Sequence, residues 1–445
     1  MDQQMSLNFS DYSFSVFKEE FFSTKLGQIY QGIPWDELAK TFNIKTHKKG
    51  PKSYFSPRGK LALMFLKHYA CCSDELLLEQ LNANQHYQFF CDIFLPVGKK
   101  LSNFKIISEI RCELAEALNI EALEQILASH WLPYMDDVRS AVTDATCYES
   151  AVRYPTDQKL LWECVNWVYD LLITLCSDLR IKKPRCKYTK WKLRYGAYSR
   201  KRRKSAKERT ILTRALLNLL LKLHNELDKI LSENDVELTP KCYKQQALTK
   251  QVYQQQNTLF TTGEKPKGRI VSLAKPYLRP IVRGKEIKKV EYGAKVNKIQ
   301  IDGISFIQKL SFEAFNEGTQ FKNSVFYAQK LTGKKLYIMG ADAIYATNAN
   351  RKFATKNNIR TDFCRKGRAG KHEKERVTLA KAIKKERGTT LEGSFGKDKM
   401  HYYLQNIRAR TEKTEILWIF FGIHTSNALE IGRRMTQASQ REQAA

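Results

Sequence analysis

Apolar positions in the first third of the chain recur every three or four residues, which is the spacing of amphipathic helices. The clearest such runs are residues 61–69, 75–81 and 107–118. Ser73 or Asp74 is the expected N-cap of the second run, and Ser102 that of the third. We therefore expect residues 1–130 to form a helical N-terminal domain, whose basic connectors suit contact with a DNA duplex.

Two later runs have the character of buried strands and carry an aspartate. Residues 139–146 are mostly small or β-branched and include Asp144, and residues 336–340 form an apolar run just before Asp342. Chemistry in open α/β sheets is usually placed outside strand ends. On pattern alone, a turn-forming aspartate is the commoner explanation. A function for either residue therefore needs support from the rest of the chain.

A long helical pattern separates these two runs, from residue 158 to about residue 256. Within it, apolar residues follow heptad spacing at Leu216, Leu220, Leu223, Leu227 and Ile230. Two heptads are too few for a coiled coil, so we expect a helix hairpin within the chain.

The pattern returns to strands after residue 265. A hairpin is predicted to turn near Asp302 and Gly303, and a helix to end before Gly333. Further predicted elements are a helix at 348–358, a strand at 361–364 and a helix at 371–387. The order strand, helix, strand implies a parallel crossover. The expected fold class is α/β, a mixed sheet with flanking helices. The expected domains are 1–130, helical; 131–157 with 260–435, α/β; 158–259, a basic helical insertion; and 436–445, a tail.

The charge of the chain favours a polyanionic partner. Its 76 lysines and arginines exceed its 46 acidic residues, which gives a net charge of +30. Nucleic acid is the first candidate; a membrane is not expected, because we find no apolar run of 18 residues. The first eleven residues lack a signal-peptide pattern. The ten cysteines show no zinc-ligand spacing. We expect a cytoplasmic protein that faces DNA and has no structural zinc.

The most basic stretch lies within the predicted insertion. Residues 180–210 contain fifteen lysines and arginines and a single acid, Glu208. Five of the basic residues are consecutive: Arg200, Lys201, Arg202, Arg203 and Lys204. A basic run is often only a solvated segment. The aromatic residues interleaved here favour an ordered surface that contacts phosphates.

A third carboxylate completes a candidate site. Glu392 follows Asp342 by 50 residues, with a predicted strand and helix between them. If the first and fourth strands are neighbours, Asp144 and Asp342 lie together, and a following helix can place Glu392 over them. Three close carboxylates cannot all stay ionised without cations. Two Mg²⁺ ions would resolve this repulsion and would suit phosphodiester displacement.

At these residues the sequence resembles the DDE transposases of bacterial insertion sequences, whose catalytic core is similar to that of RNase H. The resemblance covers most of the chain after residue 135. It is carried by the motifs at 142–146, 153–157, 281–285, 340–345, 391–396, 408–411 and 427–429.

The resemblance implies an RNase H-like fold in which Asp144, Asp342 and Glu392 are catalytic and bind Mg²⁺, with Mn²⁺ as the alternative. It also implies DNA contact by Lys399 and by the matched motif that contains Arg283 and Lys285. One departure is visible. A subgroup of the family carries Tyr and Arg at fixed offsets before the glutamate, where this chain has Lys385 and Gly388, with Arg387 one place off. This departure places the chain in a neighbouring subgroup.

Other acidic residues compete less well for the metal. Asp136 and Asp137 precede the first strand, Asp157 is expected to cap a helix, Asp302 to make a turn, and Asp362 to lie inside the last strand. Glu412 and Glu415 come too late in the chain. For His401 we expect packing or phosphate contact.

The sequence thus predicts an endonuclease and strand-transfer enzyme, acting on transposon ends and target DNA as a homodimer near the bacterial nucleoid. The dimer is expected from the resemblance alone. One alternative is a catalytically inactive DNA-binding regulator or relic on the same scaffold. Another is an RNA-binding protein, which would explain the charge but leave the three carboxylates without a role.

Overall fold

The computed structural model describes residues 11–44, 53–96, 98–282 and 290–444, and it divides into two compact units. Unit 1 comprises residues 1–151, 294–311 and 315–445; unit 2 comprises residues 152–293 and 312–314. The predicted insertion, 158–259, falls inside unit 2. The predicted N-terminal domain falls inside unit 1, together with most of the predicted α/β domain.

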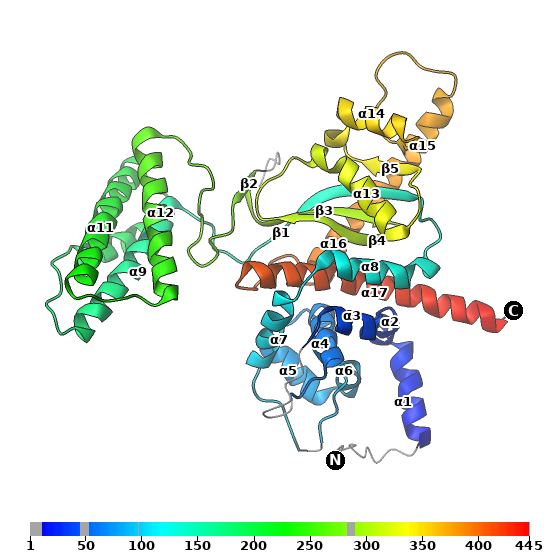
Figure 1. Cartoon of the computed structure of the whole chain (residues 1–445), viewed down its shortest axis with the longest axis horizontal. Helices are drawn as coiled ribbons and strands as arrows, with labels where there is room; N and C mark the ends of the chain where they lie inside the picture. Colours follow the sequence, from blue (N-terminus) through cyan, green and yellow to red (C-terminus); the bar gives the residue numbers. More distant parts are fainter. Residues whose placement is uncertain (1–10, 45–52, 97, 283–289, 445) are drawn as a thin grey trace. The chain divides into compact units, whose positions relative to one another are not determined.

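The first part of unit 1 is helical, as predicted (Figure 1). Its helices are α1 (Asp11–Ser23), α2 (Lys25–Gln31), α3 (Trp35–Thr41), α4 (Pro57–Ala70), α5 (Asp74–Ala83), α6 (Gln85–Phe90), α7 (Lys105–Glu116) and α8 (Ile120–Trp131). Ser73 caps α5, where its Oγ accepts from the Leu76 N–H. The predicted cap at Ser102 is wrong, because α7 begins three residues later. There Asn103 Oδ1 accepts from the Lys105 N–H instead.

These helices pack around α17 (Glu412–Ala444), whose middle part is buried. The Phe65 and Phe421 rings meet edge to face, with their centroids 4.8 Å apart. Glycine allows α2 to approach closely, because a Cβ at Gly432 would overlap the carbonyl oxygen of Gln28. Residues 436–444, predicted to be a tail, continue α17.

His68 of α4 contacts the chain just after α16 (Glu392–His401), since its Nδ1 lies 2.9 Å from the carbonyl oxygen of Tyr402. A carbonyl only accepts, so Nδ1 must donate. The pKa of His68 is lowered to about 3, mainly by burial and also by the charges of Lys67 and Arg111. The neutral ring is therefore part of the folded state.

We expect acid to destabilise unit 1 through this histidine. The folded pKa lies below the unfolded value of about 6.5, so the stabilisation is complete above pH 6.5 and is lost as the pH falls toward 3. Between pH 7 and 4.5 the loss should be about 2–3 kcal/mol. The variant His68→Asn keeps an N–H donor without the titration, so its urea unfolding should depend less on pH. The exposed His372→Asn is the control and should behave as wild type.

The sheet contains the strand order β3–β1–β5–β6, with β4 also paired to β3, and it has the mixed character that was predicted. Its strands are β1 (Ser140–Glu149), β3 (Val290–Ile301), β4 (Ile304–Ser311), β5 (Ile338–Ala341) and β6 (Arg360–Thr361). β5 is parallel to both β1 and β6, and β3 is antiparallel to β4. The predicted hairpin is confirmed: Asp302 and Gly303 join β3 to β4 with positive φ angles of 48° and 79°. In unit 2, β2 (Pro280–Val282) pairs with the first residues of β3.

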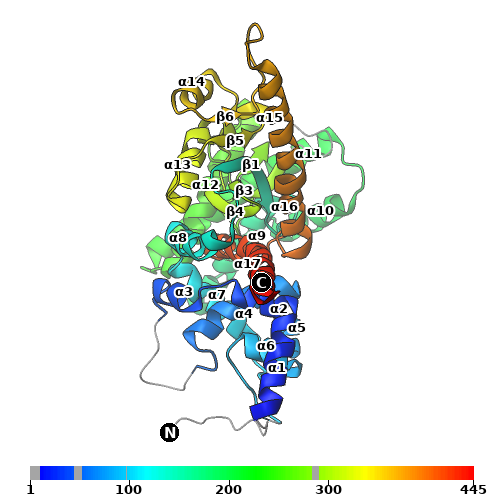
Figure 2. The ribbon, with the colours of Figure 1, turned by 90° about the vertical axis from the view of Figure 1, so that its right-hand side faces the viewer.

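Helices cover both faces of this sheet (Figure 2). On one side lies α13 (Phe321–Thr332), which ends before Gly333, as predicted. On the other side lie α15 (Glu373–Glu386), a π-helical turn, η4 (Arg387–Leu391), and α16. The short helix α14 (Asn348–Lys356) precedes β6. Because β6 is only two residues long, Asp362 follows this strand rather than lying inside it.

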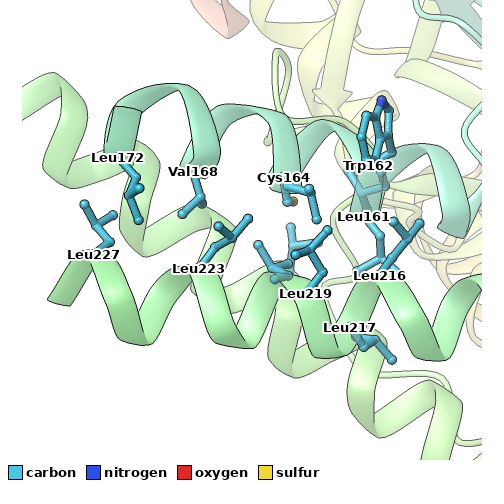
Figure 3. Packing of buried hydrophobic residues seen from close by; sticks show 14 of the residues in the cluster. Leu161, Trp162, Cys164, Val168, Leu172, Leu216, Leu217, Leu219, Leu223 and Leu227 are labelled. Atoms are coloured by element: carbon cyan, nitrogen blue, oxygen red, sulfur yellow. The ribbon is translucent and has the colours of Figure 1, made fainter. Parts of the chain in front are cut away.

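Unit 2 is built on α9 (Asp157–Asp178), α10 (Tyr188–Arg200), α11 (Ala206–Glu233) and α12 (Pro240–Thr262). The heptad leucines of α11 are buried against Leu161, Val168 and Leu172 of α9 (Figure 3). The prediction that this seam packs within the chain is confirmed. Among the described residues, α9 is also the helix long and apolar enough to cross a membrane by length and composition. Its apolar side chains form the core of unit 2.

Candidate functional site

Asp144 and Asp342 lie side by side at the centre of the sheet. The parallel register of β1 and β5 ends with Thr143 opposite Ala341; Asp144 is the next residue of β1, and Asp342 directly follows the end of β5. Gly340 lets α15 lie close over this pair of strands, since a Cβ there would overlap the Ile383 side chain. The predicted neighbourhood of the first and fourth strands is therefore confirmed.

The carboxyl group of Asp144 is in an unfavourable environment for a negative charge. The pKa of Asp144 is raised to about 6, mainly by burial and also by the charges of Glu317 and Asp342. The Ala145 N–H donates to Asp144 Oδ1 over 2.8 Å and opposes this shift, as does the charge of Arg387. An added cation near Asp144 would favour the ionised form.

Glu317 is an acidic neighbour of Asp144 that sequence reasoning missed. It opens the 3₁₀ turn η2 (Glu317–Gln320), and its Oε1 forms an ion pair of 2.7 Å with Lys295 Nζ on β3. No local pattern marks this residue, because its approach to the sheet depends on tertiary packing.

Arg387 is a second neighbour that the sequence did not assign to the site. Its Nη1 lies 3.2 Å from Asp342 Oδ1, and its Nε lies 3.8 Å from Asp362 Oδ2. Asp362 is buried and its Oδ1 accepts from the Ala341 N–H, directly before Asp342. Burial raises the pKa of Asp362, and Arg387 opposes this effect.

The helix that begins with Glu392 lies over the face of β1 that carries Asp144. Residues 142, 144, 146 and 148 share one face of the strand. Leu391 packs against Val142, and Lys399 Nζ donates to Thr146 Oγ1 over 3.1 Å. Asp144 lies between these two contacts and so faces the first turns of α16.

A buried polar network holds α16 in this place. Lys298 Nζ on β3 lies 2.6 Å from Asp398 Oδ2 and donates to Ser394 Oγ, and the Tyr148 hydroxyl donates to the same Asp398 oxygen over 2.5 Å. Both charged side chains are almost fully buried, with exposures of 0% and 2%. Burial lowers the pKa of Lys298 and Asp398 opposes this effect. Removing either partner of such a pair would leave the other charge buried and uncompensated.

The structure brings two of the three predicted carboxylates together and places the third on the helix above them. Glu392 itself is exposed. Within the described ranges, no group of three His, Cys, Asp or Glu residues is close enough to hold a metal ion. The complete metal-binding trio therefore stays a prediction.

The rival aspartates have structural partners. Asp302 Oδ2 pairs with Arg434 and accepts from the Asp136 N–H. Asp157 pairs with Arg269, and the cap of α9 that was expected at Asp157 is Thr156.

The predicted DNA-contacting residues differ in their surroundings. All fifteen lysines and arginines in residues 180–210 are exposed. The aromatic residues among them pack inward, with Tyr188 stacked on Tyr169 and Trp162. Arg283 and Lys285 lie outside the described residues. Lys399 contacts β1 rather than solvent alone.

Residues 17–113 match a family model described as a transposase domain (DUF772). Neither the comparison with curated proteins nor the comparison with solved structures found a match. The matched segment covers most of the helices α1 to α7. It supports a role in transposition, for which DNA is the partner.

Proposed function

We propose that this chain is a DNA transposase that cuts and joins phosphodiester bonds at the terminal inverted repeats of its insertion sequence. Asp144, Asp342 and Glu392 are its catalytic carboxylates. The observation that carries the proposal is the juxtaposition of Asp144 and Asp342 beneath the helix that Glu392 opens, in a chain whose N-terminal helices match a transposase-domain model.

Two of the three proposed ligands suit a hard divalent cation. Asp144 and Asp342 offer carboxylate oxygens, which Mg²⁺ and Mn²⁺ prefer. Burial raises the pKa of Asp144, and the charges of Glu317 and Asp342 add to that effect; a cation beside the carboxylate would oppose it. When bound, a pair of such ions supplies an activated hydroxyl and a stabilised leaving oxygen.

The chain's own groups would position the DNA strand for this chemistry. Asp144 is held on rigid β1, and the Lys298–Asp398 pair fixes α16 above it. Lys399, whose Nζ donates to Thr146 on β1, would also contact a phosphate near the cleavage site. Two copies of the chain would bridge the two ends, in the cytoplasm beside the nucleoid.

The basic segment of unit 2 would supply phosphate contacts along the duplex. Changing residues 200–204 together to glutamate should weaken binding to end-containing DNA at least about tenfold near 0.1 M salt. The slope of log K against log salt should become shallower by up to about 4.5, because each of the five residues can contact one phosphate and roughly 0.9 counterion is released per contact. Lys241→Glu with Lys244→Glu, two exposed lysines elsewhere in unit 2, is the matched control. Gel shifts at several salt concentrations measure both quantities. An unchanged slope would remove this segment from the interface.

The function is tested by incubating the purified chain with linear DNA that carries its element's ends. We expect cleavage at the ends with Mg²⁺ or Mn²⁺ and none with EDTA, while binding persists in both. Binding without cleavage under every metal condition would instead support an inactive regulator or relic. The exposed position of Glu392 and the lack of a three-ligand group among the described residues favour that alternative.

A further inference from the structure

Arg387 lies against the candidate metal site without forming well-aligned hydrogen bonds there. Its guanidinium is within 3.2 Å of Asp342 and 3.8 Å of Asp362, and the side chain is only 17% exposed. Its Nε is buried and has no hydrogen-bond partner among the described residues. The pairing therefore lacks the added strength and geometric specificity of a bidentate arginine–carboxylate pair.

The π-turn explains how Arg387 reaches this place. The Glu392 N–H donates to the Arg387 carbonyl oxygen, five residues earlier, because the turn η4 contains one residue more than an α-helical turn. Arg387 and Glu392 are therefore one helical turn apart. An ordinary α-helix gives this relation to residues four apart. In the sequence, Arg387 stands one place too far from Glu392 for the family pattern. The extra residue of the π-turn makes up for this one-residue shift.

Most of the charged side chains around Arg387 are acidic. Asp342 and Asp362 form its ion pairs, and its charge also acts on Asp144. Glu317 acts on Asp144 as well, but is already paired with Lys295. Lys384, one turn earlier, adds positive charge near Asp362. Among the described residues, Arg387 is thus the cation that forms an ion pair with Asp342 in the metal-free chain.

We propose that Arg387 is the built-in counter-cation of the carboxylate site: it neutralises Asp342 and Asp362 before metal binds and competes with the incoming divalent cation for Asp342. This inference rests on the proposed function, because it assumes that Asp342 is a metal ligand. Arg387 acts here as a positioning residue. The affinity for the metal then depends on the carboxylates and on the free energy needed to displace the Arg387 guanidinium from Asp342.

The test is Mn²⁺ binding by titration calorimetry, with the full-length chain and no DNA. Arg387→Gln should bind Mn²⁺ about five- to tenfold more tightly than wild type, because the competing charge is gone. Arg387→Lys should stay within about twofold of wild type. Arg376→Gln, which removes an arginine of α15 paired only with Glu373 among the described acids, should leave affinity unchanged. A merely structural role would weaken binding, so the sign of the change decides.

A second measurement uses the metal-free chain. In EDTA at pH 7.5, Arg387→Gln should have a lower Tm than wild type, because Asp342 and Asp362 lose their counter-cation. Saturating Mn²⁺ should reduce this difference in Tm between the two proteins. If wild type binds Mn²⁺ and Arg387→Gln binds it equally or more weakly, the counter-cation role is overturned while the proposed function stands. No Mn²⁺ binding by wild type would contradict the proposed two-metal function and this inference with it. An unchanged Tm in EDTA would also overturn the counter-cation role.

Discussion

Replacing Asp144 or Asp342 with asparagine is expected to lower Mg²⁺-dependent cleavage of end-containing DNA by at least about a thousandfold. Glu392→Gln should have the same effect. Each change keeps the size of the side chain and removes the negative charge of one carboxylate. The affinity for DNA in gel shifts should therefore stay within about twofold of wild type. Any two of these substitutions combined should cost little more than one, since the three residues act as a unit.

The matched control is the variant Asp136→Asn, which should cleave DNA as wild type does. Asp136 is an exposed aspartate just before β1. Asp144→Asn should also be no less stable than wild type in EDTA at neutral pH, because burial raises the pKa of Asp144 in the folded chain. Cleavage that survives in Asp144→Asn, Asp342→Asn or Glu392→Gln would remove that residue from the proposed site.

Breaking the buried pair between Lys298 and Asp398 is expected to cause the largest loss of stability. Lys298→Met should lower the free energy of unfolding by about 3–5 kcal/mol, because it leaves the Asp398 carboxylate buried without its cation. Urea unfolding followed by circular dichroism measures this loss. Since the pair anchors α16, the variant should also lose cleavage under conditions in which it is still folded.

A second substitution separates charge from shape. Lys298→Met with Asp398→Leu should recover stability to within about 1 kcal/mol of wild type, because no buried charge remains. The exposed pair of Lys330 and Glu121 provides the control, and Lys330→Met should change stability by less than about 1 kcal/mol. A small loss in Lys298→Met would show that the pair does not hold α16.

The sequence predicted the features that depend on neighbouring residues. The turn at Asp302 and Gly303, the cap at Ser73 and the helix end at Gly333 all follow from local backbone chemistry. The sequence treated the pairing of the strands that lead to Asp144 and Asp342 only as a condition, because a crossover places strands in one sheet without fixing which of them are neighbours.

The features that depend on distant contacts could not be predicted. Lys298 looks like an outward-facing residue in a polar stretch, and its role appears only when Asp398, 100 residues later, is packed against it. Glu317 carries no motif. The π-turn that brings Arg387 to Asp342 has no sequence signature, so Arg387 looked displaced by one position. In each case the decisive interaction is tertiary.

The order of elements along the chain also constrains biosynthesis. β1 leaves the ribosome before both strands that flank it in the sheet, since β3 begins at Val290 and β5 at Ile338. At about 5–20 residues per second, the 140 or so residues between β1 and β3 take roughly 7–30 s to translate. Throughout that interval the nascent strand bearing Asp144 has two unsatisfied edges. A chaperone that shields β1 during this interval would therefore raise the yield of soluble protein.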